Sequence, residues 1–154
     1  MVGDTSFKGT AMKLILALGI LLAQAPTRNP CAFTAPAGWN QSATRWDGAC
    51  RDGRAEGLGV LKEYRQQSVV RFFFGRLEHG QLKLGVIDQP EGFVAGEFAK
   101  GELLPSADRQ RAVDAFAEGE KAANEASSRF NKAGKAAPAK LYAAKARELH
   151  DQLD

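Results

Sequence analysis

The chain has 154 residues, of which 44% are hydrophobic, 25% charged and 8% aromatic. This composition excludes collagen-like, low-complexity and mostly disordered chains, and the length fits one compact domain after any targeting segment is set aside. The net charge of +3 is spread evenly along the chain, without the basic footprint of a nucleic-acid-binding protein. We therefore expect no nucleic-acid partner.

An uncharged apolar run lies near the start of the chain, at residues 14–23. Lys13 precedes it, and Ala23-Gln24-Ala25 closes it with the small-x-small pattern of a signal-peptidase site. The run is short for a membrane-spanning helix, which needs roughly 20 residues. The sequence predicts that residues 1–25 are a signal peptide, with Met12 as an alternative start, and that the protein is exported to the periplasm or secreted. A buried N-terminal helix is the alternative interpretation.

Two cysteines, Cys31 and Cys50, remain in the predicted mature chain. Export leads to an oxidising compartment, so we expect a Cys31–Cys50 disulfide, with two buried thiols as the alternative. The spacing of these cysteines with His79 and His150 does not fit a Cys/His zinc site. We expect neither a metal nor a cofactor.

Residues 26–105 combine glycines with aromatic residues and with turn dipeptides, namely Asp47-Gly48, Asp52-Gly53, His79-Gly80 and Lys100-Gly101. Residues 60–64 and 69–74 are rich in β-branched and aromatic side chains and are bounded by glycine and polar turns. This pattern is typical of short strands joined in hairpins. Strand alternation would place Phe73 on one face of the sheet, and Phe72 and Phe74 on the other.

After Pro105 the sequence changes character, because alanine becomes the dominant residue. Ser106 could cap a first helix. Apolar residues recur at helical spacing at Val113, Phe116, Ala123 and Phe130, and again at Tyr142, Ala146, Leu149 and Leu153. Pro138 fits the first turn of the second helix. We predict an α+β fold, in which an antiparallel sheet of β-hairpins precedes two helices at residues 106–154 that are packed on the sheet or extend from it.

A short motif occurs three times in the predicted sheet: apolar-x-Gly-x-apolar-x-x-Gly, beginning at Trp46, Phe73 and Val94. Alternation places the two apolar residues and the first glycine on one face of a strand, and the second glycine allows a tight reversal. A glycine between two bulky side chains leaves room for the ring of a neighbouring repeat to lie against the backbone.

Residues 46–60 resemble the MORN (membrane occupation and recognition nexus) repeat, whose pattern is aromatic-x-Gly-x-aromatic-x-x-Gly-x-x-x-Gly-x-Gly. Cys50 stands where that family has an aromatic residue, and the other two units keep only the front half of the pattern. The matching scaffold residues are Trp46, Gly48, Gly53, Gly57, Gly59, Phe73, Gly75, Gly80, Gly96, Phe98 and Gly101. The resemblance covers residues 44–104. It implies stacked β-hairpins that hold partners, in some members at membranes, and it implies no reaction.

Few side chains in this sequence suggest catalysis. His79 and His150 are isolated, and Asp-Gly pairs have a conformational role in turns. No Lys-Ser or Lys-Thr follows Gly57-Leu58-Gly59, so this segment is not a phosphate loop. We predict a non-enzymatic protein with no catalytic residues.

The predicted function is binding to another envelope or extracellular protein through the sheet surface. The candidate contact residues are Trp39, Tyr64, Phe72 and Phe74, if part of their surface stays exposed. The alternative is that the stacked hairpins bury one face of the sheet and that the helices, with Phe116, Phe130 and Leu149, bury the other. A lipid- or cell-wall-associated module is one alternative, and a small inhibitor or immunity-type protein of an envelope-acting enzyme is another. Acidic and basic residues alternate around the predicted helices, so we expect no strong membrane binding.

Overall fold

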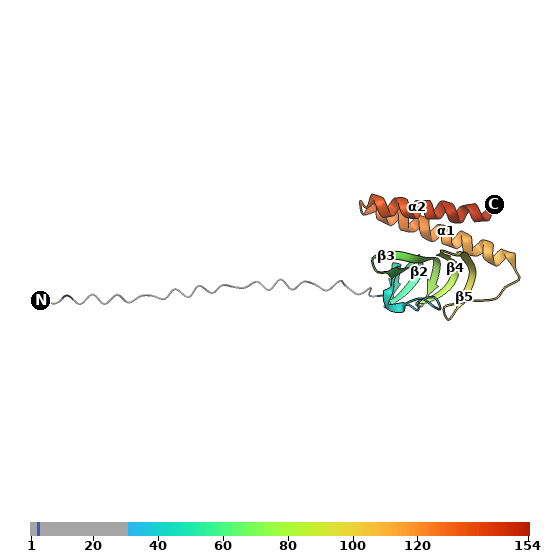
Figure 1. Cartoon of the computed structure of the whole chain (residues 1–154), viewed down its shortest axis with the longest axis horizontal. Coiled ribbons are helices and arrows are strands. Elements are labelled where there is room, and N and C mark those ends of the chain that lie inside the picture. Colours follow the sequence, from blue (N-terminus) through green and yellow to red (C-terminus); the bar gives the residue numbers. More distant parts are fainter. Residues whose placement is uncertain (1–2, 4–30) are drawn as a thin grey trace.

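In the computed structural model, which describes Gly3 and residues 31–154, a sheet of six strands is followed by two helices. The strands are β1 (Thr44–Arg51), β2 (Arg54–Arg65), β3 (Ser68–Glu78), β4 (Gln81–Gln89), β5 (Gly92–Ala99) and β6 (Glu102–Leu103). They pair antiparallel in chain order. Helix α1 (Arg109–Lys132) packs on one face of the sheet, and α2 (Ala136–His150) packs along α1 (Figure 1). The predicted α+β fold is confirmed, whereas the predicted signal peptide, apart from Gly3, lies outside the described residues.

A row of paired glycines crosses the sheet. It consists of Gly48, Gly59, Gly75, Gly85 and Gly96, each paired directly with the next. A Cβ atom on Gly48 or Gly59 would overlap the Trp46 ring, and one on Gly75 or Gly85 would overlap the Phe73 ring. Each ring therefore lies against the backbone of its own strand and of one neighbouring strand. The expectation that the ring comes from a neighbouring repeat is wrong, because one ring covers both strands of a pair.

The second glycine of each motif lies in a two-residue hairpin turn. Both central residues have a positive φ in Asp52-Gly53 (51° and 75°), His79-Gly80 (49° and 77°) and Lys100-Gly101 (51° and 78°). A pair of left-handed residues defines the type I′ turn, whose twist matches that of the flanking strands. The glycine spacing noted in the sequence therefore places three equivalent turns at the same end of the sheet.

Residues 31–43, here called the N-terminal strap, cover the face of the sheet opposite the helices. Main-chain N–H groups of the strap donate to a carbonyl of each turn: Ala32 to Gly53 (2.8 Å), Thr34 to Gly80 (2.9 Å) and Ala37 to Gly101 (2.8 Å). Phe33 and Trp39 pack against the buried cluster of Leu61, Phe73, Leu77, Leu82, Ile87 and Phe98. The strap also contains η1 (Gln41–Ala43), a single 3₁₀ turn before β1.

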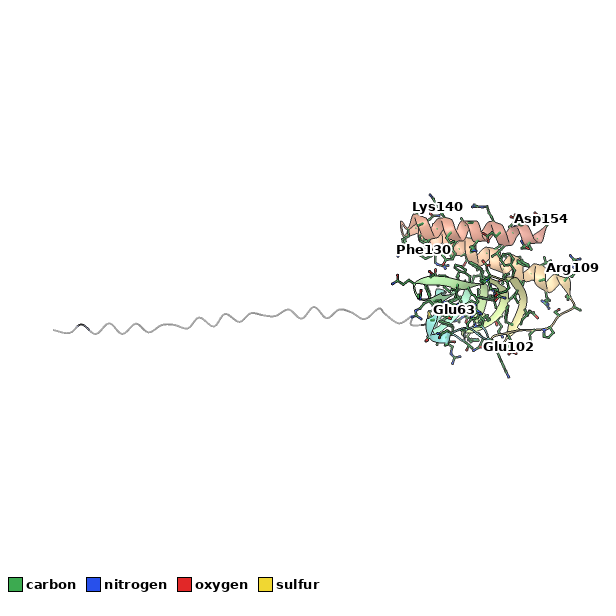
Figure 2. The ribbon with its side chains drawn as sticks, in the orientation of Figure 1. Glu63, Glu102, Arg109, Phe130, Lys140 and Asp154 are labelled. Carbon is green, nitrogen blue, oxygen red and sulfur yellow. A yellow bond between two sulfur atoms is a disulfide. The ribbon has the colours of Figure 1, made fainter. Side chains whose placement is uncertain are left out.

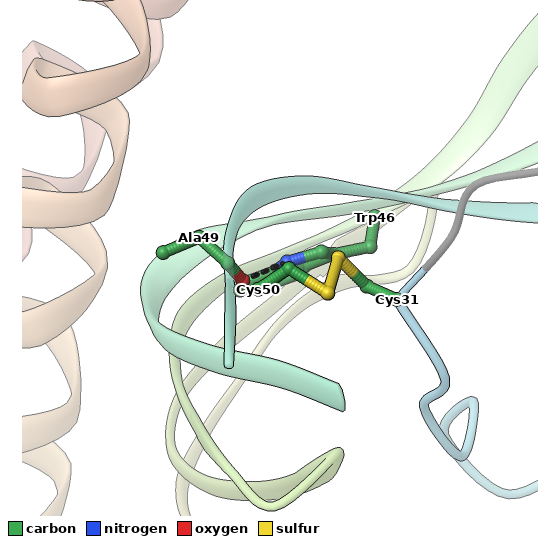
Figure 3. The surroundings of a disulfide bond; sticks show 4 residues. All are labelled: Cys31, Trp46, Ala49 and Cys50. Carbon is green, nitrogen blue, oxygen red and sulfur yellow. Dashed lines mark hydrogen bonds between the residues drawn. A yellow bond between two sulfur atoms is a disulfide. The ribbon is translucent and has the colours of Figure 1, made fainter. Parts of the chain in front are cut away.

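The predicted Cys31–Cys50 disulfide joins the start of the strap to the end of β1 (Figure 3). The two Cα atoms are 5.5 Å apart. Next to the disulfide, the Trp46 indole Nε1 donates a hydrogen bond of 2.9 Å to the carbonyl of Ala49. The crosslink therefore holds the strap beside the ring that covers the first two glycines of the row.

A second buried cluster, the core beneath the helices, lies between the sheet and the helices (Figure 2). Val60, Phe74 and Val86 of the sheet pack against a stripe of small residues on α1, namely Ala115, Gly119, Ala122, Ala123 and Ala126. Small side chains let α1 approach closely, so that a Cβ on Gly119 would lie 3.3 Å from the Phe74 carbonyl oxygen. Phe116, Phe130 and Leu149 belong to this core, as expected, whereas Val113 is 41% exposed.

Two local expectations are wrong. Asp47-Gly48 is not a turn but lies within β1, where the Trp46 ring leaves no room for a side chain at position 48. Ser106 does not cap α1, because the carboxylate of Asp108 accepts from the N–H of Gln110 at 2.9 Å and Ser106 Oγ instead accepts from the N–H of Asp108. Pro138 lies in the first turn of α2, as predicted.

Replacing both cysteines by serine should lower the free energy of unfolding by about 3 kcal/mol, because the crosslink closes a loop with a sequence separation of 19. Urea unfolding of the oxidised wild type and of the double variant measures the difference. The reduced wild type is the control and should match the variant. Equal midpoints for the oxidised and reduced wild type would contradict the prediction.

The substitution Gly75→Ala should destabilise the fold by roughly 3 kcal/mol, because its Cβ would overlap the Leu84 carbonyl oxygen and the Phe73 ring. Glu78→Ala is the matched control, since Glu78 is exposed in the same strand and should change stability by less than about 0.5 kcal/mol. Chemical denaturation compares the two variants. An equal, small effect for both would show that the row of glycines carries no packing constraint.

Candidate functional site

Both faces of the sheet are covered, so the expected binding surface on the sheet is not free. Phe74 is fully buried in the core beneath the helices, and the expectation that it contacts a partner is wrong. Phe72 is half-buried and stacks on Phe74, with ring centroids 5.4 Å apart. Of the predicted contact residues, Trp39 and Tyr64 lie outside this core, and both are half-buried.

Trp39 belongs to a chain of contacts that ends at a buried carboxylate. The Arg71 guanidinium lies over the Trp39 ring, 5.1 Å from its centroid, and Arg71 Nη2 donates to the carbonyl of Gly38 at 3.1 Å. The same guanidinium donates twice to Glu63 Oε2, from Nη2 at 2.5 Å and from Nε at 3.0 Å. The Glu63 side chain is only 7% exposed. Three contacts therefore fix Arg71, and Arg71 fixes Glu63.

An open pocket of about 800 Å³ lies beside this carboxylate, where β1 begins and β2 ends. We call it the Tyr64 pocket. Its lining includes Asn40, Ser42, Arg45, Glu63, Tyr64 and Arg65. A register shift between Glu63 and Tyr64 interrupts the alternation of β2 at this point. The lining combines hydrogen-bond donors and acceptors with one aromatic ring.

A second candidate lies at the outer edge of β5, because β6 is only two residues long. Leu104 donates its N–H to the Glu97 carbonyl at 2.8 Å, so the main-chain N–H and C=O groups of Glu97 point away from β4. In an antiparallel strand alternate residues share that direction, which places the main-chain groups of Phe93 and Ala95 on the same open edge. Within residues 31–154 no neighbouring main chain pairs with them. Leu103 and Leu104, at 42% and 43% exposed, lie beside this edge.

Two groups with shifted pKa values, Tyr142 and Lys62, lie where the helices meet the sheet. Burial raises the pKa of Tyr142, and the nearby Lys62 only partly offsets this effect. Burial alone would lower the pKa of Lys62, but Tyr142, Tyr64 and Asp47 raise it above its ordinary value. At neutral pH Lys62 is therefore charged and Tyr142 neutral, the reverse of what a lysine nucleophile or a tyrosine base requires.

A network of ion pairs joins the sheet to the helices. Asp47 pairs with Arg129 at 3.2 Å, Arg76 with Glu118 at 3.1 Å, Asp88 with Lys145 at 2.7 Å and Glu97 with Arg111 at 3.4 Å. The second oxygen of Asp47, Oδ2, is buried and accepts no hydrogen bond from residues 31–154. Asp47 therefore links β1 to α1 through its ion pair with Arg129, and it does not form the turn expected from the sequence.

Among residues 31–154, no group of His, Cys, Asp and Glu side chains is arranged to hold a metal ion. No helix in this part of the chain is both long and apolar enough to cross a membrane. His79 follows β3 in a turn, and His150 at the end of α2 lies 3.2 Å from Glu120, so the two histidines belong to different elements. Hydrogen bonding to Glu120 raises the pKa of His150.

No protein-family model, no curated protein and no solved structure matches this chain. The two candidate sites therefore depend on geometry alone. The sequence indicated Tyr64 but neither Glu63 nor the edge of β5. Glu63 could have been noticed as a charged residue at an inward position of a strand, in register with Arg71.

Replacing Lys145 by Met should destabilise the protein by roughly 1–2 kcal/mol at neutral pH, since it leaves the half-buried Asp88 carboxylate without its ion pair. Burial lowers the pKa of Lys145, but the hydrogen bond and the charge of Asp88 outweigh it and raise the pKa above 10.5. The contribution of Lys145 should therefore be complete below pH 10.5 and decline as the pH rises through the folded-state value. Urea unfolding of the wild type and of Lys145→Met across this range measures it. A difference that grows with pH would contradict this assignment.

Proposed function

We propose that this chain is a non-catalytic, exported protein of the MORN-like repeat type, and that it binds another protein of the cell envelope or the extracellular space. Its partner adds an extended segment to the open edge of β5. The repeated motif and its equivalent turns support the MORN-like assignment. The Cys31–Cys50 disulfide supports export, since disulfides persist in oxidising compartments.

The observation that carries this proposal is the main chain of Phe93 and Ala95, which no main chain within residues 31–154 pairs with on its outer side. An exposed strand edge presents a row of donors and acceptors that another extended chain can pair with. Main-chain hydrogen bonds would provide affinity, and side-chain contacts to Leu103 and Leu104 would provide specificity. Residues 31–43 cover one sheet face and the helices cover the other, so a partner reaches the sheet along an edge such as that of β5.

Replacing Ala95 by Pro tests this binding mode, because proline removes an N–H that faces away from β4. Recovery of the protein that co-purifies with the tagged wild-type chain from envelope extracts of the native host should fall about tenfold or more. Ala95→Thr is the matched control, since threonine keeps the N–H and suits a strand. It should recover the same partner at the wild-type level.

The comparison requires that both variants fold, which circular dichroism and the thermal midpoint establish. Equal recovery by a folded Ala95→Pro variant would exclude strand addition at β5. The proposed protein-binding function itself is wrong if no protein co-purifies with both the wild-type chain and the Ala95→Thr variant.

A further inference from the structure

We propose that the Tyr64 pocket binds a neutral oligosaccharide. This site is independent of the proposed protein-binding edge, because β1 and β2 lie on the opposite side of the sheet from β5. A pocket of about 800 Å³ falls within the range of roughly 300–1,000 Å³ that is usual for small-ligand sites.

The floor of the pocket provides a fixed hydrogen-bond acceptor. Both hydrogen bonds from Arg71 end on Glu63 Oε2, so Oε1 accepts none from the described residues. Glu63 nevertheless lines the pocket, and its side chain is only 7% exposed. Glu63 Oε1 is therefore open to accept a hydrogen bond from a ligand in the pocket. Trp39 and Gly38 hold Arg71 in place, which preorganises this acceptor before a ligand arrives.

The walls of the pocket provide donors and an aromatic surface. Arg65 is exposed and makes no side-chain hydrogen bond or ion pair within the described part of the chain, so its guanidinium is free to donate. Arg45 is held by the carbonyls of Ser42 (2.7 Å) and Thr44 (3.0 Å) and has further N–H groups available. Tyr64 adds a ring against which the apolar face of a ligand can pack.

This combination selects a ligand that both donates and accepts hydrogen bonds over short distances. A sugar meets the requirement, because each hydroxyl group does both and the C–H face of the ring can lie on Tyr64. A small anion fits less well, because it offers few or no hydrogen-bond donors to Glu63 Oε1. A cation fits less well too, because Arg71 already neutralises Glu63 and two further arginines line the walls.

Isothermal titration of the mature, oxidised protein with chitotetraose, cellotetraose and maltotetraose tests the proposal, with inorganic phosphate as the competing ligand. At least one tetrasaccharide should bind with a Kd of about 1 mM or below. Tyr64→Leu and Arg65→Ala should each weaken this binding roughly tenfold, through loss of the ring and of a charged donor. Tyr64→Phe keeps the ring and should bind within about twofold of the wild type.

Arg51→Ala is the control for the loss of a positive charge, because Arg51 is exposed at the other end of β1. It should leave the affinity unchanged. Since Arg65 is exposed, its replacement leaves the fold intact and decides the test even if Tyr64→Leu does not fold. The proposal is overturned if no tetrasaccharide binds, if Arg65→Ala and Arg51→Ala bind equally well, or if phosphate binds at this pocket and the sugars do not. None of these outcomes depends on recovery of a protein partner through β5.

Discussion

The packing of two aromatic rings against a row of glycines is the constraint on which the rest of the structure depends. Trp46 and Phe73 can lie on the backbone only because Gly48, Gly59, Gly75 and Gly85 have no side chains, and the five paired glycines hold neighbouring strands in one register. That register aligns the three type I′ turns at one end of the sheet. The N-terminal strap then donates a hydrogen bond to each turn, and the disulfide fixes its first residue.

The two coverings of the sheet differ in chemistry. The strap follows main-chain carbonyls and covers large apolar side chains, whereas the helices present alanine and glycine to the sheet and are held by ion pairs from β1, β3, β4 and β5. With both faces covered, the positions left for recognition are the edges and the ends of the sheet. The edge of β5 exposes main chain, and the end of β1 and β2 holds the Tyr64 pocket.

Local patterns were sufficient to predict the hairpins and the two helices, and the disulfide followed from the predicted export of a chain with two cysteines. Glycine spacing marked the turns, and apolar spacing marked the helices, because both depend on near neighbours in the chain. The sequence did not show that residues 31–43 cover a sheet face, since this depends on hydrogen bonds to turns far along the chain. The contact role expected for Phe74 and the turn expected at Asp47 were wrong for the same reason. The contacts that bury Phe74 come from α1 and α2, and the ion pair of Asp47 comes from α1.

Native-state amide hydrogen exchange of the free protein measures whether the outer edge of β5, on which the proposed binding depends, is open. We expect fast exchange at the N–H groups of Phe93 and Ala95, and slow exchange at Val94 and Gly96, which face β4. An added partner should slow exchange at Phe93 and Ala95 without changing the other two. Slow exchange at all four positions in the free protein would show that the edge of β5 is already paired and would rule out strand addition there.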